Sequence, residues 1–320
     1  MHYLVTGGAG FIGGHLCRRL VEDGHRVTIL DNLSTGRFTN VKELEKRPEV
    51  KILVESVQNE AIVREAVRGV DKVFHLASSV GVQLIMDEPI QAIENMINGT
   101  QTVLKAAAVY RKPILLTSSS EVYGKSEAVP FREDGDREYG PTSNHRWAYA
   151  NAKAIDEFLC LAHHKKHGLP VYVVRLFNTV GPGQTGQYGM VIPRFVTMAL
   201  AGDAIPVYGD GSQTRCFCHV QDVIEALEKL VNCEAAVGEV VNVGSTEEVT
   251  MLELAKRVKA RAKSKSAVKK IPYAQAFGAG FEDMQRRVPA IEKVKKLIGW
   301  APKSDLNKIL DDIIAERRKK

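Results

Sequence analysis

The chain has 320 residues, of which 44% are hydrophobic and 26% are charged, and its net charge is +6. This length and composition suit one large domain, or two intimately joined ones, with an ample core. The positive excess lies late, mostly in 256–270 and 317–320, and no nucleic-acid-binding motif accompanies it. We therefore expect solvated helix faces and no nucleic-acid partner. No apolar run reaches the ~18 residues of a membrane span, so we also expect no membrane partner.

Five cysteines are scattered along the chain without a C-x-x-C pair. This pattern favours free thiols in a reducing compartment, and we expect the protein to be cytoplasmic. Cys216, Cys218 and His219 could suggest a metal site, since alternate residues of a strand share one face. No distant pair of Cys or His completes a tetrahedral set, so we expect no metal.

The first thirty-one residues contain the strongest local signal in the chain. An apolar run at 1–6 precedes GGAGFIG at 7–13, an amphipathic stretch extends to about residue 22, and a second apolar run at 27–31 ends in an acid. This order predicts a strand, a glycine turn, a helix and a strand, which together form a dinucleotide-binding unit.

Each glycine of this unit has a physical role. Gly7 permits the tight turn, Gly10 lets the backbone approach a pyrophosphate, and Gly13 lets the helix pack on the strand. The free N–H groups at the start of the helix then face the anion. Asp31 can accept hydrogen bonds from both hydroxyls of an adenosine ribose, and its carboxylate would repel a 2′-phosphate. The sequence therefore predicts NAD rather than NADP as the cofactor.

Strands and helices continue to alternate up to about residue 178. Strands are predicted at 50–54, 70–76, 114–117 and 171–177, and helices at 61–68, 89–110 and 148–164. This alternation predicts an α/β fold with a Rossmann-type, doubly wound parallel sheet.

The pattern changes after residue 178. Helices are predicted at 192–201, 220–231 and 250–260, a last strand at 240–243, and two short helices between 284 and 310. Thr250 is a predicted N-cap, because Glu253 follows three residues later. We predict a dinucleotide-binding domain formed by 1–178 with about 217–244. The rest, about 179–216 and 245–320, is predicted to form a smaller, discontinuous C-terminal substrate-binding lobe.

A tyrosine and a lysine share one face of the helix predicted at 148–164. Tyr149 and Lys153 are separated by one helical turn. The lysine charge favours the phenolate, so Tyr149 could act as a base near neutral pH. Lys153 could also bind the nicotinamide ribose. The serine run at 118–120 follows a predicted strand, where a hydroxyl could bridge the tyrosine and a substrate.

With these motifs in place, the chain resembles the extended short-chain dehydrogenase/reductases that act on nucleotide sugars as epimerases, dehydratases and decarboxylases. The resemblance covers essentially the whole length. Besides GGAGFIG, its motifs are HLAS at 75–78, SSSEVYG at 118–124, YANAK at 149–153, RLFNTVGPG at 175–183, YGDGSQTRCFCHVQD at 208–222 and VNVGS at 241–245.

The resemblance implies a role for each residue that matches a family motif. Tyr149 would take the proton of the sugar 4-hydroxyl while C4 is oxidised by NAD. Lys153 would hold the cofactor and lower the tyrosine pKa, and Ser119 or Ser120 would hydrogen-bond the 4-oxygen. Asn178 would contact the sugar or its diphosphate, and Arg215 would pair with the diphosphate.

The implied binding residues form two sets. The expected NAD contacts are Gly7, Gly10, Phe11, Ile12, Gly13, Asp31, Asn32, Ser34, Thr35, Gly36, Leu76, Ala77, Ser78, Tyr149 and Lys153. The expected substrate contacts are Arg146, Asn178, Arg194, Tyr208, Gln213, Arg215 and Arg287. Two positions on the cofactor side depart from the family pattern. Ser56 replaces the usual Asp, and Met96 replaces an Asn, with Asn95 one position earlier.

Residues near the serine run favour one reaction within the family. The pair Ser120-Glu121 resembles that of UDP-glucuronate decarboxylases and of GDP-mannose 4,6-dehydratases. Arg146, three residues before the tyrosine, and Arg287, in an Arg-Arg-Val-Pro segment, both resemble the decarboxylases. An arginine suits the carboxylate of a uronate, although Arg287 could instead pair with phosphate. Glu121 could be a base or a structural carboxylate.

The leading hypothesis is decarboxylation of UDP-glucuronate to a UDP-pentose. The alternatives are 4-epimerisation of a UDP-hexose or UDP-hexuronate, a 4,6-dehydratase, and a cofactor-binding protein without catalysis. Relatives pair through the helices that correspond to 89–110 and 148–164, so we expect a homodimer.

Overall fold

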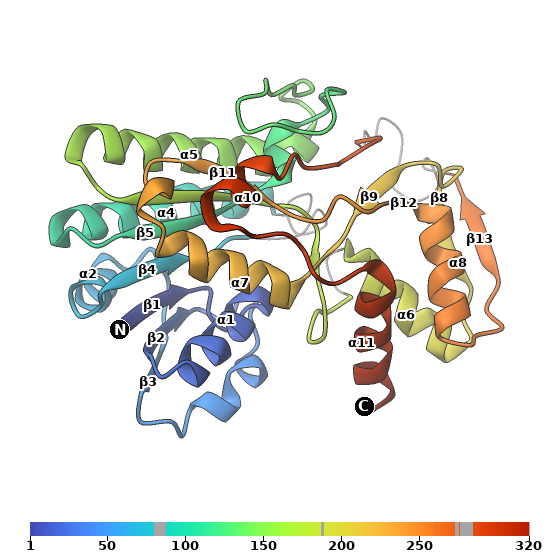
Figure 1. Cartoon of the computed structure of the whole chain (residues 1–320), viewed down its shortest axis with the longest axis horizontal. Coiled ribbons are helices and arrows are strands. Elements are labelled where there is room, and N and C mark those ends of the chain that lie inside the picture. The colour runs from blue at the N-terminus through green and yellow to red at the C-terminus, as the bar shows by residue number, and fades with distance from the viewer. Residues whose placement is uncertain (80–87, 187–188, 273–274, 276–283, 320) are drawn as a thin grey trace.

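The computed structural model describes residues 1–79, 88–186, 189–272, 275 and 284–319. A seven-stranded sheet with the order β3-β2-β1-β4-β5-β6-β11 forms the centre of the larger lobe (Figure 1). All of its neighbouring strands are parallel. The predicted α/β fold with a doubly wound parallel sheet is therefore confirmed.

The elements of the larger lobe follow the predicted order. Its strands are β1 (His2–Thr6), β2 (Arg26–Asp31), β3 (Val50–Val54), β4 (Lys72–His75), β5 (Ile114–Ser119), β6 (Val171–Leu176) and β11 (Val240–Val243). Its helices are α1 (Phe11–Glu22), α2 (Glu60–Arg68), α4 (Pro89–Tyr110), α5 (Ala148–His167), α7 (Val220–Val231) and α10 (Glu292–Ile298). Short 3₁₀ turns lie at Phe38–Asn40, Lys42–Leu44, Ser120–Tyr123, His145–Trp147 and Glu234–Ala236.

Side chains alternate between the two faces of the sheet, so each strand contributes to two cores. In β1, Tyr3 and Val5 pack toward α1 and α7, whereas Leu4 packs toward α2, α4 and α5. Helices therefore cover both faces of the sheet (Figure 1). A parallel sheet needs this cover because both of its faces are apolar.

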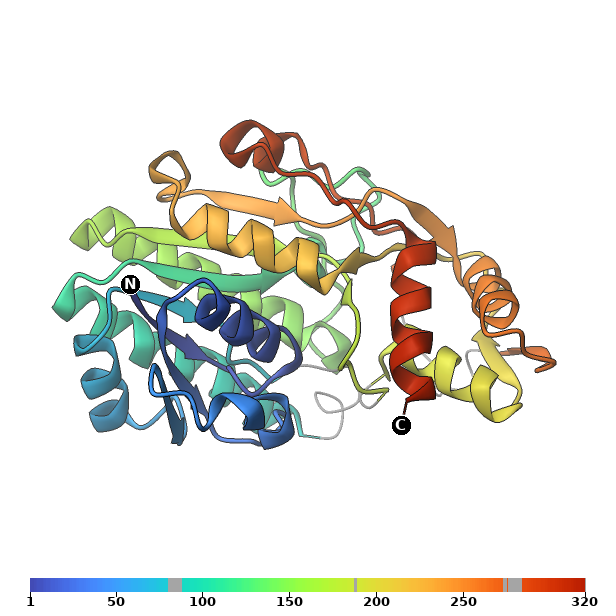
Figure 2. The same cartoon turned by 60° about the horizontal axis from the view of Figure 1, so that its bottom comes forward.

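The smaller lobe has a core of its own. It contains α6 (Val191–Ala201), α8 (Met251–Arg261) and α11 (Leu306–Arg318), with β8 (Ile205–Tyr208) paired to β13 (Val268–Ile271) and β9 (Thr214–Cys216) paired to β12 (Glu248–Thr250). In Figure 2 the red helix α11 stands beside the yellow helix α6 and the orange helix α8. Apolar side chains from these three helices form one buried cluster.

The N-cap predicted for α8 is confirmed. The Thr250 hydroxyl accepts a hydrogen bond from the backbone N–H of Glu253 at 3.1 Å. The domain boundaries stay a prediction. The predicted boundaries assign α10 to the smaller lobe, although Val294 of α10 packs in the same core as α1 and α7.

Three sequence expectations differ from the structure. The strand predicted at 70–76 is shorter, and the last helix continues past residue 310 to Arg318. The two cysteines that were expected on one strand lie on two strands: Cys216 ends β9, whereas Cys218 begins β10 (Cys218–His219), which pairs with β7 (Thr179–Val180). Phe217 separates them and packs in the core of the smaller lobe.

The described residues contain no group of three or more His, Cys, Asp and Glu side chains arranged to hold a metal. In the same part of the chain, no helix combines the length and apolarity needed to cross a membrane.

Candidate active site

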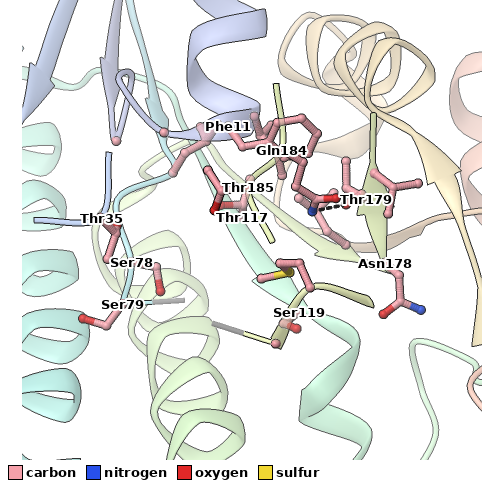
Figure 3. Close-up of a pocket in the computed structure, with 18 of the residues that line it drawn as sticks. Phe11, Thr35, Ser78, Ser79, Thr117, Ser119, Asn178, Thr179, Gln184 and Thr185 are labelled. Atoms are coloured by element: carbon pink, nitrogen blue, oxygen red, sulfur yellow. Dashed lines mark hydrogen bonds between the residues drawn. The ribbon is translucent and has the colours of Figure 1, made fainter. Parts of the chain in front are cut away.

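A cleft of about 1050 Å³ runs from the carboxyl ends of the sheet strands to the smaller lobe. In an open α/β sheet this edge is where ligands bind. All the residues that the sequence nominated for the cofactor, the chemistry and the substrate line this cleft. Their individual roles stay predictions. Figure 3 shows Ser78, Ser119 and Asn178 around the same space. The three residues come from different elements of the fold.

The glycine turn leaves no room for side chains at the start of α1. A Cβ at Gly13 would lie 2.1 Å from the Gly7 carbonyl oxygen, and one at Gly7 would lie 2.6 Å from the backbone nitrogen of Ala77. Gly10 is the N-cap of α1 and has no side chain to cover the first N–H groups. The helix therefore presents open donors to the cleft, as an NAD pyrophosphate requires.

Asp31 stands at the end of β2 with its carboxylate fixed by two backbone donors. Ala9 N–H donates to Oδ2 at 2.9 Å, and Leu33 N–H donates to Oδ1 at 2.8 Å. Burial raises the pKa of Asp31, and these backbone donors oppose the rise. Since Asp31 also lines the cleft, its position fits the predicted contact with an adenosine ribose.

The end of β4 offers an open polar group. The Ser78 hydroxyl is buried and makes no hydrogen bond with the part of the chain that the structure describes. It lines the cleft, so a ligand that lies there can satisfy it. The glycine cradle, Asp31 and Ser78 together fit a dinucleotide such as NAD.

The two departures from the family pattern also lie at this end. Ser56 and Asn95 both line the cleft, whereas Met96 is buried in α4. The Asn95 side-chain oxygen accepts hydrogen bonds from Gln58 at 2.8 Å and from Gln91 at 2.9 Å. Asn95 therefore provides a fixed amide at the cleft.

Tyr149 and Lys153 occupy the first turns of α5, beside the serines that end β5. Lys153 Nζ is buried and donates to the Thr117 carbonyl oxygen at 3.2 Å. Burial raises the pKa of Tyr149, while Lys153 and Ser119 oppose that rise. Lys153 therefore acts on the Tyr149 pKa in the expected direction, burial has the larger effect, and the role of Tyr149 as a base stays a prediction.

Glu121 is held between two arginines that come from distant segments. Arg146 Nη1 lies 2.6 Å from Glu121 Oε2, and Arg287 pairs with the other carboxylate oxygen. Burial would raise the pKa of Glu121, but Arg287 and Arg146 outweigh it and lower the pKa to about 2. At neutral pH Glu121 is therefore an anion that holds two guanidinium groups, and it is a poor base.

Further polar side chains connect this cluster to the smaller lobe. Arg287 Nη1 donates to Asn178 Oδ1 at 3.2 Å, and Asn178 Nδ2 donates to the Cys216 carbonyl oxygen at 2.8 Å. Arg215 donates to the carbonyl oxygens of Thr214 and Met284, both at 2.8 Å.

The far end of the cleft contains an arginine stacked on a tyrosine. Arg194 donates to the Tyr208 hydroxyl at 2.6 Å, and its guanidinium lies 5.0 Å from the centre of the ring. Gln213 donates to the Tyr208 carbonyl oxygen at 3.1 Å. Arg194 and the three arginines described above, Arg146, Arg215 and Arg287, line the half of the cleft on the side of the smaller lobe. Their guanidinium groups suit a ligand with several anionic oxygens.

Gln184 lies in the cleft but is not among the residues that the motifs predicted. This residue follows the motif that ends at 183, and it lines the cleft close to Thr179 and Thr185 (Figure 3). Its side-chain nitrogen donates to the Thr179 carbonyl oxygen at 3.1 Å. Its side-chain oxygen is buried without a hydrogen-bond partner among the described residues. Its place directly after a matched motif is the signal that could have identified it.

A dinucleotide cradle that meets a Tyr–Lys pair defines a class of protein, the short-chain dehydrogenases/reductases. Comparison with known proteins gives the family. The model of the GDP-mannose 4,6 dehydratase family matches residues 4–313. The chain belongs to this nucleotide-sugar epimerase/dehydratase family of extended short-chain dehydrogenases/reductases, and it is an enzyme of that family.

Two relatives named as decarboxylases are similar over nearly the whole chain. UDP-N-acetyl-alpha-D-glucosaminuronate decarboxylase of Bacillus cytotoxicus is 42% identical over 300 residues, which are 93% of this chain and 92% of the relative. UDP-glucuronic acid decarboxylase 1 of Danio rerio is 38% identical over 311 residues, which are 97% of this chain and 71% of the relative.

Solved structures of the family share the fold. One is a UDP-glucose 4-epimerase with UDP-glucose from Thermotoga maritima, with a TM-score of 0.89 and 27% sequence identity. The match covers 100% of this chain and 99% of the epimerase chain. Another is a dTDP-glucose 4,6-dehydratase from Streptomyces venezuelae with NAD bound, with a TM-score of 0.89 and 27% sequence identity. The match covers 100% of this chain and 97% of the dehydratase chain.

Proposed function

We propose that the protein uses NAD to decarboxylate a UDP-linked uronate, with UDP-glucuronate as the leading substrate and a UDP-pentose as the product. The observation that carries the proposal is the buried pair Arg146 and Arg287 on Glu121, in the same cleft as Tyr149. A carboxylate ligand can share these arginines. The similarity to two UDP-uronate decarboxylases supports the same reaction.

NAD would be held in the half of the cleft next to the sheet. The open N-terminus of α1 would face its pyrophosphate, Asp31 its adenosine ribose, and Lys153 its other ribose. When bound, NAD supplies the oxidant for C4 of the sugar. A solved relative with NAD supports this assignment.

The side chains of this protein would handle protons and charge. Tyr149 would accept the proton of the sugar 4-hydroxyl, and Ser119 or Ser120 would donate a hydrogen bond to the 4-oxygen. Once C4 is a ketone, the substrate is a β-keto acid. The bond between C5 and the carboxylate would then break to release CO2, and its electron pair would move to the 4-oxygen, where the serine hydroxyl stabilises the negative charge. A proton would then add at C5, and the hydrogen removed from C4 would return there as hydride, which completes the UDP-pentose.

The substrate half of the cleft would bind the UDP group. Arg215 would pair with the diphosphate, and Arg194, Tyr208 and Gln213 would complete the nucleotide-binding end. Asn178 would lie between the diphosphate and the sugar. Arg287 could instead bind a phosphate, because a guanidinium group pairs equally well with phosphate and carboxylate oxygens.

Product analysis tests the proposal. The purified protein is incubated separately with UDP-glucuronate, UDP-N-acetylglucosaminuronate and UDP-glucose, and the products are analysed by mass spectrometry. We expect one of the uronates to lose the mass of one CO2. Unchanged mass with altered stereochemistry would favour the 4-epimerase, and loss of one water from UDP-glucose would favour the dehydratase. No change in any substrate would favour a cofactor-binding protein without catalysis.

We also propose that the protein is a homodimer. Exposed apolar side chains lie on α4, at Ile90 and Val109, and on α5, at Ile155 and Phe158, with Ile90 73% and Phe158 60% exposed. Because α4 and α5 pack against each other, a second copy of the two helices could cover these side chains in a four-helix bundle.

We also propose that the protein works in a reducing compartment, the cytoplasm, because of the state of its cysteines. All five are free, and four of them are buried. Free thiols of this kind are typical of proteins in reducing compartments.

A further inference from the structure

A second carboxylate lies next to Lys153, on the side away from the cleft. Asp156, three residues further along α5, is fully buried, and its Oδ2 lies 3.5 Å from Lys153 Nζ. Lys153 lines the cleft, whereas Asp156 is not among the described residues that line it. The ammonium of Lys153 therefore lies between the cleft and a carboxylate that the reaction described above does not use.

The other titratable groups around this pair are already engaged or neutral. Glu157 is bound by Arg175 of β6 at 2.8 and 3.0 Å and accepts from Ser118 at 2.5 Å. The ring of His75, in β4, lies between the hydroxyls of Thr6 and Thr100. Burial is the larger and the charge of Lys153 the smaller of the two causes that lower the pKa of His75 to about 3, so it is neutral.

The remaining groups lie on α5 itself or on the cleft side. Burial raises the pKa of the Cys160 thiol on α5, so this group is neutral. On the cleft side stand Tyr149 and Glu121, and Glu121 is paired with its two arginines. Among the described residues, Asp156 is therefore the carboxylate that pairs with Lys153. Burial raises the pKa of Asp156, and the charge of Lys153 opposes that rise.

We propose that Asp156 is a positioning residue that acts through Lys153. It holds the ammonium in place beside the Thr117 carbonyl and offsets part of the positive charge that Tyr149 experiences. The inference rests on the proposed function, because it assigns Tyr149 as the group that accepts the proton. The physical basis is that an anion close to a cation reduces the field of that cation at a third group.

Removal of the Asp156 charge should shift the pH dependence in a defined direction. An uncompensated ammonium stabilises the phenolate more strongly, so Tyr149 loses its proton at lower pH. The acidic limb of the rate profile should therefore move to lower pH. We expect a shift of about 1 pH unit, which is about a tenfold faster rate on the acidic limb.

The experiment compares the wild type with Asp156→Asn, which keeps the shape and removes the charge. Glu65→Gln, at an exposed carboxylate on α2, is the charge-matched control. The first readout is kcat for CO2 release as a function of pH. The second is the ultraviolet absorbance of the tyrosinate, measured as the difference from Tyr149→Phe in each background, which requires no turnover.

We expect Asp156→Asn to shift both readouts to lower pH and Glu65→Gln to leave both in place. A rate that falls equally at every pH, with an unchanged tyrosinate titration, would reduce Asp156 to a structural residue and overturn the inference. If Asp156→Asn does not fold, Asp156→Ser serves as the second variant. A wild type that decarboxylates no UDP-uronate would refute the proposed function, while the tyrosinate titration would still test Asp156.

Discussion

Tyr149 must lose its proton before it can accept one, and its partly buried position opposes that loss. Burial raises the pKa of the phenol, although Lys153 and Ser119 act against the rise. A raised pKa means that the phenolate fraction grows as the pH increases. We therefore predict that the initial rate of CO2 release rises from acidic to alkaline pH.

Tyr149→Phe provides the control for this assignment. Loss of a general base typically reduces the rate by ~10²–10⁴-fold, and we expect a loss of at least about 100-fold while bound NAD is retained. Rates are measured with a coupled CO2 assay, and bound NAD is measured after denaturation. A rate that stays flat with pH, or normal turnover in the variant, would remove Tyr149 from the proposed role.

Glu121 contributes to stability through its two arginines. Its pKa, which burial would raise, is lowered by Arg287 and Arg146 from 4.5 to about 2. A carboxylate with a lowered folded-state pKa stabilises the protein fully above its unfolded value, and this contribution is lost as the pH falls through the folded value. The stabilisation should therefore decrease between about pH 4.5 and about pH 2.

We predict that Glu121→Gln lowers the free energy of unfolding by about 3 kcal/mol at neutral pH, because two buried arginines lose their counter-ion. Denaturant unfolding measures the change. Asp134→Asn is the matched control, since its pair with Arg132 is exposed and should contribute little. Equal stability of Glu121→Gln and the wild type at neutral pH would contradict the role of Glu121 as a counter-ion.

At the scale of single elements, the start of α8 depends on its cap. The Thr250 hydroxyl satisfies one N–H of the first turn. Thr250→Ala should destabilise the protein by about 1 kcal/mol, and Thr250→Ser, which keeps the hydroxyl, should destabilise it less. Thermal unfolding of the three proteins measures this difference. Equal losses in both variants would show that the hydroxyl is not the cause.

Element boundaries were predictable where local chemistry marks them. Helix α4 begins and ends where the sequence places it, with Pro89 in its first turn. Helix α5 continues three residues beyond the predicted end to His167, because Gly168 ends it in the left-handed conformation. That glycine is visible in the sequence and could have given the boundary. Helix α11 extends past the predicted residue 310 into the basic end of the chain, because Ile313 and Ile314 pack in the core of the smaller lobe.

The members of the site were predictable from motifs, but their pairing was not. Arg287 meets Glu121 across a separation of 166 residues, and such a contact depends on how the two lobes pack. The buried pair of Lys153 and Asp156 lies within one helix, yet its burial comes from the sheet and from α4. For the same reason, the direction of the Lys153 effect on the Tyr149 pKa was predictable from the sequence, but the larger effect of burial was not.

For the whole molecule, the exposed apolar face of α4 and α5 predicts a dimer. Phe158 is 60% exposed on α5, so Phe158→Glu should disrupt the pairing and give a monomer by light scattering. Val54→Glu, at an exposed apolar residue on β3, is the matched control and should leave the dimer intact. A monomeric mass for the wild type would contradict the proposal.

The most direct test of the proposed reaction follows two labels through one turnover. UDP-glucuronate is prepared with carbon-13 in the carboxylate and deuterium at C4, and the gas and the sugar product are analysed by mass spectrometry and NMR. We predict labelled CO2 together with a UDP-pentose that keeps deuterium at C4, because the atom removed from C4 in the first step returns there in the last. A sugar that keeps the labelled carboxylate, or a UDP-pentose that has lost the deuterium from C4, would contradict decarboxylation through a 4-ketone whose hydrogen returns to C4.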